Sequence, residues 1–222
     1  MVDKNERQLK RERIAKRIVK EFKENALVNL GIGLPTLCAN FLPRDKGIML
    51  HSENGFIGLG PAATEENPDM DLVNAGGNPV TIVKGGCFFD SATSFSIIRG
   101  GHLDATVLGA LQVDGQGNLA NYMIPGKMVA GMGGAMDLVT GARQVIIATE
   151  HTNKRGEPKI LDKCTLPLTG VNVVDLIVSD MAVIRMTKEG PLLEEIAEDT
   201  TIEEVVEKTG AKLIIPENVG RF

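Results

Sequence analysis

Two runs rich in aliphatic and β-branched residues place the strongest limit on how this chain can fold. Residues 105–113 and 143–149 are largely apolar, without the strict polar–apolar alternation of a strand with one wet face. Such runs are typical of strands in the middle of a sheet that helices cover on both faces. Similar short runs, separated by glycine-rich turns and helical stretches, occupy residues 26–30, 47–52, 176–179, 181–186 and 212–215. The sequence predicts an α/β fold with an open, mixed and largely parallel sheet flanked by helices.

The predicted helices begin at recognisable signals. Between Lys4 and Lys23, apolar residues recur near helical spacing with Lys, Arg and Glu between them. This is the one basic stretch of a chain whose net charge is −5, so it indicates a solvated helix face and not a nucleic-acid or membrane contact. Pro35 is typical of a helix's first turn, and Thr200 or Thr201 is the expected N-cap of a short helix.

The length of 222 residues fits one sizeable α/β domain. No repeat, low-complexity segment or linker divides the chain, so residues 1–222 are interpreted as a single domain. The 3 histidines and 3 cysteines are scattered, and no spacing resembles a metal site. Cys38, Cys87 and Cys164 are interpreted as buried thiols in a reducing environment. No apolar run is long enough to span a membrane, and a cytoplasmic location is expected.

Residues 50–60 carry the most informative chemical pattern. A strand is expected to end at Ser52, and Glu53 follows immediately, before a glycine-rich loop. A carboxylate at this point would project from the mouth of the sheet, and because it is ionised at neutral pH it needs no helper base to act as a nucleophile. By local pattern alone, a turn cap or an ion pair with a surface lysine explains Glu53 equally well.

Two glycine-rich segments suggest close contact between backbone and ligand. The segment 131–135 leaves its amide N–H groups unshielded, as stabilisation of an oxyanion requires, although a tight turn is the alternative. Gly31 and Gly33 follow a predicted strand, but Pro35 and Thr36 stand where a dinucleotide fingerprint needs its helix and third glycine. We therefore reject NAD binding.

Residues 52–55, Ser-Glu-Asn-Gly, resemble the active-site signature of the family I, 3-oxoacid type CoA transferases. Further stretches that resemble this family lie at residues 28–35, 74–76, 94–95, 98–102, 119–121, 124–128, 131–137 and 164–169. They cover most of the chain from about residue 26 to residue 215, in the order and spacing of the family's glutamate-bearing β subunit. The resemblance implies the open α/β fold shared by the NagB, RpiA and CoA-transferase proteins.

The resemblance also implies a reaction and its residues. CoA would move between a short-chain acyl-CoA (acetoacetyl-, butyryl- or acetyl-CoA) and a carboxylic acid, by a ping-pong mechanism through a glutamyl-CoA thioester on Glu53. CoA is then a substrate and a covalent intermediate, and neither a permanently bound cofactor nor a metal is expected. Gly134 would donate its amide to the oxyanion, and Asn29 would hold a carbonyl or carboxylate, unless it only ties down a turn. The implied substrate- and CoA-binding set further contains Gly31, Gly33, Asn54, Gly133, Ala135 and Lys127.

Partner and substrate follow from two departures within the family. Single-chain members contain a second, related half that this sequence lacks, so an α subunit is implied, as in the usual α2β2 assembly. Members that favour succinate or 3-oxoadipate often carry a lysine directly after Asn-Ala-Gly, where this chain has Gly77. The acetate, butyrate and acetoacetate branch is therefore expected, and a succinyl-CoA:3-oxoacid or 3-oxoadipate transferase is the alternative. A sugar-phosphate isomerase or a non-catalytic effector-binding module on a related fold are rivals from other classes.

Overall fold

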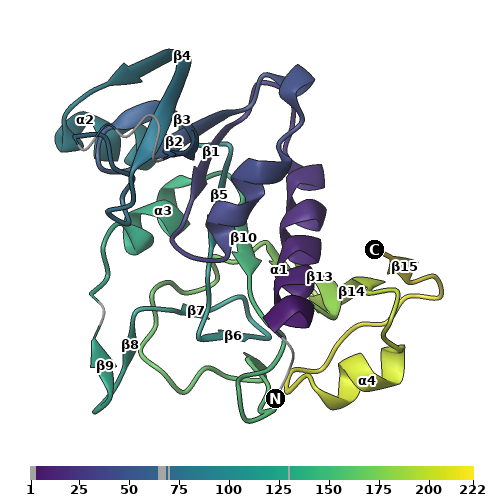
Figure 1. Ribbon diagram of the computed structural model, residues 1–222. Helices are drawn as coiled ribbons and strands as arrows, with labels where there is room; N and C mark the ends of the chain where they lie inside the picture. Colours follow the sequence, from purple (N-terminus) through teal and green to yellow (C-terminus); the bar gives the residue numbers. More distant parts are fainter. Residues whose placement is uncertain (1–3, 65–68, 70, 130) are drawn as a thin grey trace.

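The computed structural model (Figure 1) describes residues 4–64, 69, 71–129 and 131–222. Over these residues, ten strands form one sheet in the order β15-β14-β13-β12-β10-β5-β1-β2-β3-β4. Five neighbouring parallel strands make its middle: β12 (Leu176–Val178), β10 (Val145–Ala148), β5 (Ala105–Leu108), β1 (Leu27–Leu30) and β2 (Met49–Ser52). The predicted mixed, largely parallel α/β sheet is confirmed.

Antiparallel pairs extend the sheet on both sides of this parallel block. These outer strands are β3 (Phe56–Ala62), β4 (Val80–Phe88), β13 (Ala182–Thr187), β14 (Gly190–Ile196) and, parallel to β14, β15 (Gly220–Arg221). The prediction of a glycine-rich loop after Glu53 is wrong, because that segment is β3. Its glycines let two backbones approach closely: a Cβ at Gly58 would lie 2.7 Å from the Gly86 Cα of β4.

Helical segments cover the two faces of the sheet. They are α1 (Lys4–Ile18), η1 (Val19–Glu21) and η2 (Pro35–Phe41) on one face, and α2 (Ser91–Arg99) and α3 (Ala135–Gly141) on the other. Figure 1 shows α1 crossing in front of the sheet. Within β10, Ile146 packs with Ile14 of α1, whereas Ile147 belongs to the core beneath α2 and α3. Both faces are therefore buried, which explains the continuous apolar runs.

Smaller elements lie outside the main sheet. They are η3 (Arg44–Lys46), the three-stranded sheet of β6 (Gln112–Asp114), β7 (Leu119–Ala120) and β11 (Ile160–Leu161), the hairpin of β8 (Met123–Ile124) and β9 (Met128–Val129), and α4 (Ile202–Glu207). The N-cap prediction at Thr201 is confirmed by a capping box: its hydroxyl accepts from the Glu204 N–H at 3.2 Å, and the Glu204 carboxylate accepts from the Thr201 N–H at 3.0 Å.

Several boundary predictions need correction. The run 105–113 is not one strand, because the chain leaves the main sheet after Leu108 and re-enters β structure in the small sheet. Residues 212–215 form only an isolated bridge at Ile214, and η2 is a 3₁₀ helix. The three cysteines are free thiols, but only Cys38 is buried, and Cys87 is exposed on β4. A cytoplasmic location stays a prediction; in the described part of the chain, no helix is long and apolar enough to cross a bilayer.

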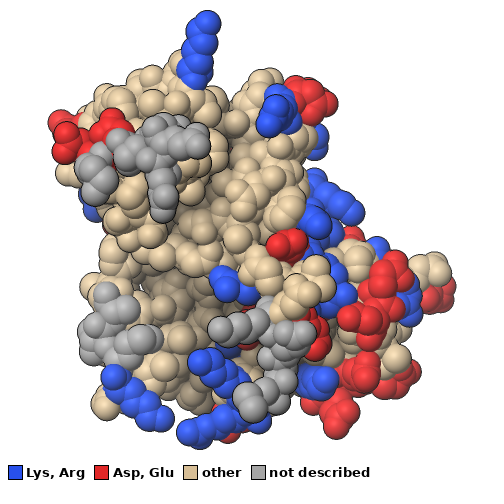
Figure 2. Space-filling view, viewed as in Figure 1, with Lys and Arg blue, Asp and Glu red and all other residues tan. Residues whose placement is uncertain are grey.

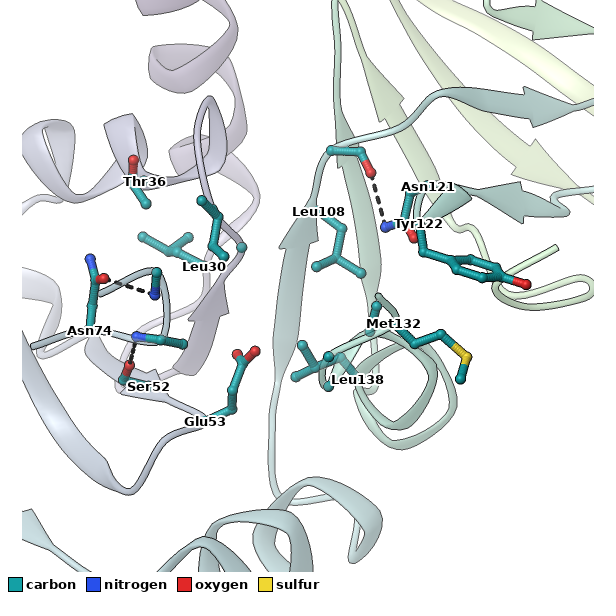
Figure 3. Close-up of a pocket in the computed structure, with 18 of the residues that line it drawn as sticks. Leu30, Thr36, Ser52, Glu53, Asn74, Leu108, Asn121, Tyr122, Met132 and Leu138 are labelled. Atoms are coloured by element: carbon teal, nitrogen blue, oxygen red, sulfur yellow. Dashed lines mark hydrogen bonds between the residues drawn. The ribbon is translucent and has the colours of Figure 1, made fainter. Parts of the chain in front are cut away.

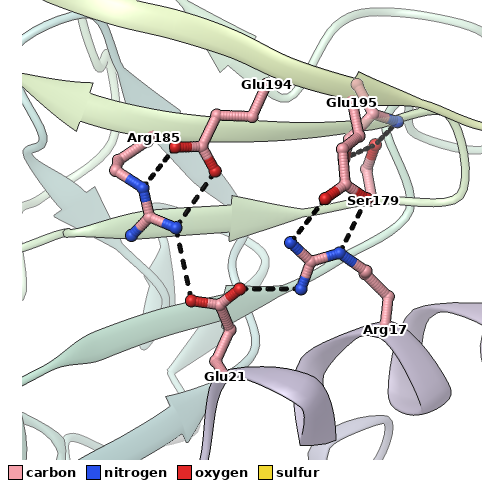
Figure 4. A network of polar contacts seen from close by, with 7 residues as sticks. Arg17, Glu21, Ser179, Arg185, Glu194 and Glu195 are labelled. Carbon is pink, nitrogen blue, oxygen red and sulfur yellow. Dashed lines mark hydrogen bonds and ion pairs between the residues drawn. The ribbon is translucent and has the colours of Figure 1, made fainter. Parts of the chain in front are cut away.

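A network of charged side chains ties the end of the first helix to the sheet (Figure 4). The Arg17 side chain is only 8% exposed and binds Glu21 of η1 at 2.7 Å and Glu195 of β14 at 2.8 Å. Glu21 continues the network to Arg185 of β13 at 3.3 Å, and Arg185 in turn binds Glu194. One charge of the helix, whose basic face was expected to be solvated, is thus buried and paired with carboxylates.

Candidate active site

Glu53 lies at the carboxyl end of β2, in the tight turn that leads into β3. The turn is closed by a hydrogen bond of 3.0 Å from the Gly55 N–H to the Ser52 carbonyl. Gly55 has φ +133°, and a Cβ there would meet the Phe89 carbonyl oxygen at 2.3 Å, so only glycine fits. The turn therefore fixes the carboxylate at the edge where parallel sheets bind ligands.

The Glu53 side chain lines a cavity of about 510 Å³ (Figure 3). Leu30, Leu108 and Leu138 give its walls apolar surface, while Asn74, Asn121 and Tyr122 contribute polar groups. In the described part of the lining there is no Lys, Arg or His. The cavity thus combines one carboxylate with a mostly uncharged wall.

Asn29 donates a hydrogen bond to the Glu53 carboxylate. Its side chain on β1 is fully buried, and its Nδ2 donates to Glu53 Oε2 at 3.1 Å. On its other side, Asn29 Oδ1 accepts a hydrogen bond of 3.4 Å from the Thr106 hydroxyl. The amide is therefore fixed with its donor end toward the carboxylate, and it does not itself line the cavity.

A buried histidine supports this amide in turn. His51 Nδ1 lies 3.3 Å from Asn29 Nδ2, and His51 Nε2 lies 3.0 Å from the Ser94 hydroxyl. Because an amide nitrogen only donates, Nδ1 acts as acceptor and the neutral ring carries its proton on Nε2. Burial lowers the pKa of His51 to about 4, which keeps the ring neutral. Ser94 falls in a stretch that resembles the family, but nothing in the sequence indicated a role for it or for His51.

The buried histidines lead to a prediction on pH and stability. Burial lowers the pKa of both His51 and His151 to about 4, whereas in the unfolded chain these rings take up protons below about pH 6.5. The unfolded state thus binds more protons between these values, so the free energy of unfolding should fall as pH drops from about 6.5 to about 4, by a few kcal/mol.

Chemical denaturation at pH 7 and at pH 4.5 measures this loss. Replacing both rings, as His51→Gln and His151→Gln, should shrink the difference between the two pH values, and His102→Gln on the exposed His102 is the matched control. An unchanged difference in the double variant would show that other groups cause the acid sensitivity.

Gly134 lies beside the Glu53 carboxylate. It is the N-cap residue of α3, and a Cβ built on it would lie 3.4 Å from Glu53 Oε1 and 3.2 Å from Phe95 Cζ. Gly133, with φ +49°, turns the chain into this position, and Gly133, Gly134 and Ala135 all line the cavity. The Gly134 backbone and the Glu53 carboxylate therefore lie side by side at the same cavity.

Of the other residues predicted to bind substrate or CoA, some line the cavity and some do not. Gly31 lines the cavity, and its N–H donates to the Val107 carbonyl at 2.8 Å. Gly33 and Asn54 do not line it; the exposed Asn54 side chain instead donates to the Val73 carbonyl at 2.8 Å. Lys127 lies in the exposed β8–β9 turn, away from the cavity lining.

Two cavity segments were not predicted as binding residues. Asn74 fixes its own loop by accepting hydrogen bonds from the N–H groups of Gly76 and Asn78, at 2.9 and 3.1 Å. Asn121 follows β7, and its Nδ2 donates to the Gly109 carbonyl at 3.2 Å. Both residues fall in stretches that resemble the family, 74–76 and 119–121, but the resemblance assigned a binding role to neither.

The described residues contain no candidate metal centre, since no three of their His, Cys, Asp or Glu side chains group together. Arg99, at the end of α2, is paired with Asp137 of α3 at 2.6 Å.

Comparison with known proteins identifies a family that this chain matches. The model of the family described as coenzyme A transferase matches residues 11–208. The beta subunit of the acetate CoA-transferase of Escherichia coli K12 is 54% identical over 202 residues, which are 91% of this chain and 92% of that protein. The B subunit of the probable succinyl-CoA:3-ketoacid coenzyme A transferase of Bacillus subtilis is 51% identical over 209 residues, 94% and 97% of the two chains.

Longer relatives match this chain over part of their own length. It is 47% identical over 211 residues to the human mitochondrial succinyl-CoA:3-ketoacid coenzyme A transferase 2, of which it spans 41%. An acyl-CoA transferase apoenzyme structure from Escherichia coli O157:H7 has the same fold, with a TM-score of 0.75 at 20% identity over 96% of this chain and 43% of that one. The matched family model and the half-identical bacterial chains together show that the chain belongs to the coenzyme A transferase family of enzymes and is of its beta-subunit type.

Proposed function

We propose that this chain is the glutamate-bearing subunit of an enzyme that transfers CoA between short-chain carboxylic acids, through a thioester on Glu53. The observation that carries the proposal is the position of the carboxylate: it lines the cavity, Asn29 Nδ2 holds it at 3.1 Å, and the Gly134 backbone lies beside it. The partner in this proposal is an α subunit in an α2β2 assembly.

The proposed reaction has two mirrored halves. A Glu53 oxygen attacks the thioester carbonyl of the acyl-CoA, and the C–S bond breaks to give a mixed anhydride and the CoA thiolate. The thiolate attacks the glutamyl carbonyl, which releases the first acid and leaves a glutamyl-CoA thioester. A second carboxylate then reverses both steps and leaves as the new acyl-CoA. The thioester bond energy is conserved, so the sequence of steps needs no ATP.

The neighbours of Glu53 supply what these steps require. Each attack places negative charge on a carbonyl oxygen, and preorganised N–H donors stabilise it. The Gly134 N–H and the Asn29 amide are the proposed donors, on the two sides of the carboxylate. The neutral His51 acts through Asn29, since its Nδ1 accepts from the same amide nitrogen and limits how that amide can turn.

Intact-protein mass spectrometry tests the proposal directly. The purified protein with its partner subunit, incubated with acetoacetyl-CoA, should gain a CoA-sized mass on this chain, and peptide mapping should place it on Glu53. An isomerase or a non-catalytic binding module would gain no such adduct. An adduct on another residue would overturn the assignment of Glu53.

Acetate, butyrate and acetoacetate are the proposed acids. Relatives named for acetate and for succinyl-CoA:3-ketoacid match at 54% and 51% identity, so the cavity itself is the better guide. Its described lining contains no cation. A second carboxylate would therefore be desolvated there without a partner, at a cost of several kcal/mol.

Substrate preference gives a second prediction. With acetoacetyl-CoA as donor, kcat/KM should be higher for acetate or butyrate than for succinate, in a panel of acids measured under one condition. Gly77→Lys is a poor test of the missing lysine, because Gly77 has φ +75° and a lysine there would be strained. Asn78→Lys places the cation on a residue that lines the cavity, and it should raise succinate use relative to acetate. A wild type that prefers succinate would contradict this interpretation while leaving Glu53 as nucleophile.

A further inference from the structure

A second cavity, of about 240 Å³, adjoins the Glu53 cavity and differs from it in charge. The two cavities share Ile32, Gly109 and Ala110 in their walls, so they are neighbouring parts of one hollow. The first offers no cation in its described lining. The second, called here the basic cavity, is lined by three cations: Arg7, Arg11 and Lys159.

The three cations of the basic cavity outnumber its anions. Lys159 Nζ donates to the Thr149 hydroxyl at 2.9 Å, and burial lowers the pKa of this lysine. Arg7 Nε pairs with Glu150 at 2.8 Å, the one carboxylate in the described lining. Arg11 lies one helical turn after Arg7, on the same side of α1. In Figure 2, basic side chains lie around the N-terminal end of α1, while acidic ones gather near α4. The basic cavity is thus suited to an anion.

Its place in the sheet fixes its distance from Glu53. Among the residues that line the basic cavity, Ala148 ends β10, Thr149 follows it, and Gly109 and Ala110 follow β5. Glu53 follows β2. In the sheet order β10-β5-β1-β2, three strand spacings separate the outer two strands, or roughly 14 Å. Both cavities open at the carboxyl edge of the parallel strands, where one extended ligand can reach both.

We propose that the basic cavity binds the phosphate groups of CoA while the thioester lies at Glu53. This rests on the function proposed above and adds the part of the chain that holds the far end of the substrate. The pantetheine arm between sulfur and phosphate has about thirteen bonds, the length of roughly four extended residues, or roughly 14 Å. Ile32, which is 65% exposed, lies between the two cavities and offers apolar contact to this arm. Arginine side chains bind phosphate oxygens in pairs of parallel hydrogen bonds.

The second carboxylate of a dicarboxylic acid is negatively charged like a phosphate, but it lies too close to the first carboxylate to reach the basic cavity. The two carboxyl carbons of succinate are three bonds apart, roughly the length of one extended residue, or about 3.5 Å. An acid held at Glu53 would therefore end well short of the basic cavity. Distance favours the phosphates.

The test compares thioesters with and without phosphate in Arg11→Gln and Lys159→Gln variants, purified with the partner subunit. For acetoacetyl-CoA, kcat/KM should fall about tenfold in each variant while kcat changes little, because a hydrogen bond between charged groups is lost. For acetoacetyl-pantetheine, which has no phosphate, the same variants should match wild type. Arg155→Gln is the matched control, since Arg155 is exposed and lines neither cavity.

Two controls keep the outcomes distinct. Arg11→Lys should recover part of the loss by restoring the charge, and melting curves should show that every variant is folded. The phosphate site would be overturned if kcat/KM fell equally for both thioesters or fell for neither. It would also be overturned if kcat/KM fell only with succinate as the acceptor acid. A CoA adduct on Glu53 in those same variants would show that the proposed function stands even so.

Discussion

Replacing Glu53 by glutamine is expected to abolish CoA exchange while the protein stays folded. A neutral amide cannot form the anhydride, so the loss should reach about ten-thousand-fold or more in kcat. Glutamine keeps the shape of the side chain in a turn that hydrogen bonds of the backbone already fix, so melting behaviour should change little. The CoA-sized mass adduct should disappear from this chain in the same variant.

Glu53→Asp separates position from charge. The shorter side chain keeps the carboxylate but withdraws it by about one bond from the Gly134 backbone, and a misplacement of about 1 Å can cost about a hundredfold. Asn54→Ala is the matched control, since Asn54 is the next residue in the same turn and does not line the cavity; its side chain donates to the Val73 carbonyl and accepts from the Ser52 hydroxyl at 2.6 Å. Exchange at near wild-type rate in Glu53→Gln would exclude Glu53 as the nucleophile.

The parallel core of the fold could be predicted because its signal is local. The run around β10 is buried on both faces, and continuous apolar sequence is the direct result. The outer strands β3 and β4 could not be predicted, since their glycines at 58 and 86 indicate turns when taken alone. They become strand residues only because two backbones pack closely there, a contact that no local pattern contains.

The sequence predicted the position of some site residues, but it did not indicate others at all. The end of a strand placed Glu53 at the mouth of the sheet, but only the family resemblance favoured a nucleophile over a turn cap. The contacts of His51 with Asn29 and Ser94 join separate elements, so neither spacing nor composition could indicate them. The basic cavity was missed for the same reason: Arg11 belongs to a helix interpreted as solvated, and Lys159 reaches the cavity from a distant segment.

The isolated chain is expected to be inactive in CoA exchange, and its α subunit should restore activity. Two apolar side chains at the Glu53 cavity are unusually open, since Ile32 is 65% and Met132 is 47% exposed. A cavity that is open on this side admits water, which would compete with carboxylate for the anhydride. A partner that covers the cavity at Met132, and leaves Ile32 to the pantetheine arm, would exclude water and bury apolar surface, so the two effects should appear together.

Mixing experiments make this requirement measurable. Titrating the α subunit into the isolated chain should raise exchange from background to a plateau, and the same titration with the Glu53→Gln chain should stay at background. The second arm shows that the activity needs this chain's own carboxylate and does not come from the α subunit. Met132→Glu should shift the titration to higher α concentrations, because a charge placed in a covered apolar contact weakens binding. Full exchange by the isolated chain at any concentration would refute the two-subunit proposal, and it would mean that the cavity as it stands already shields the anhydride from water.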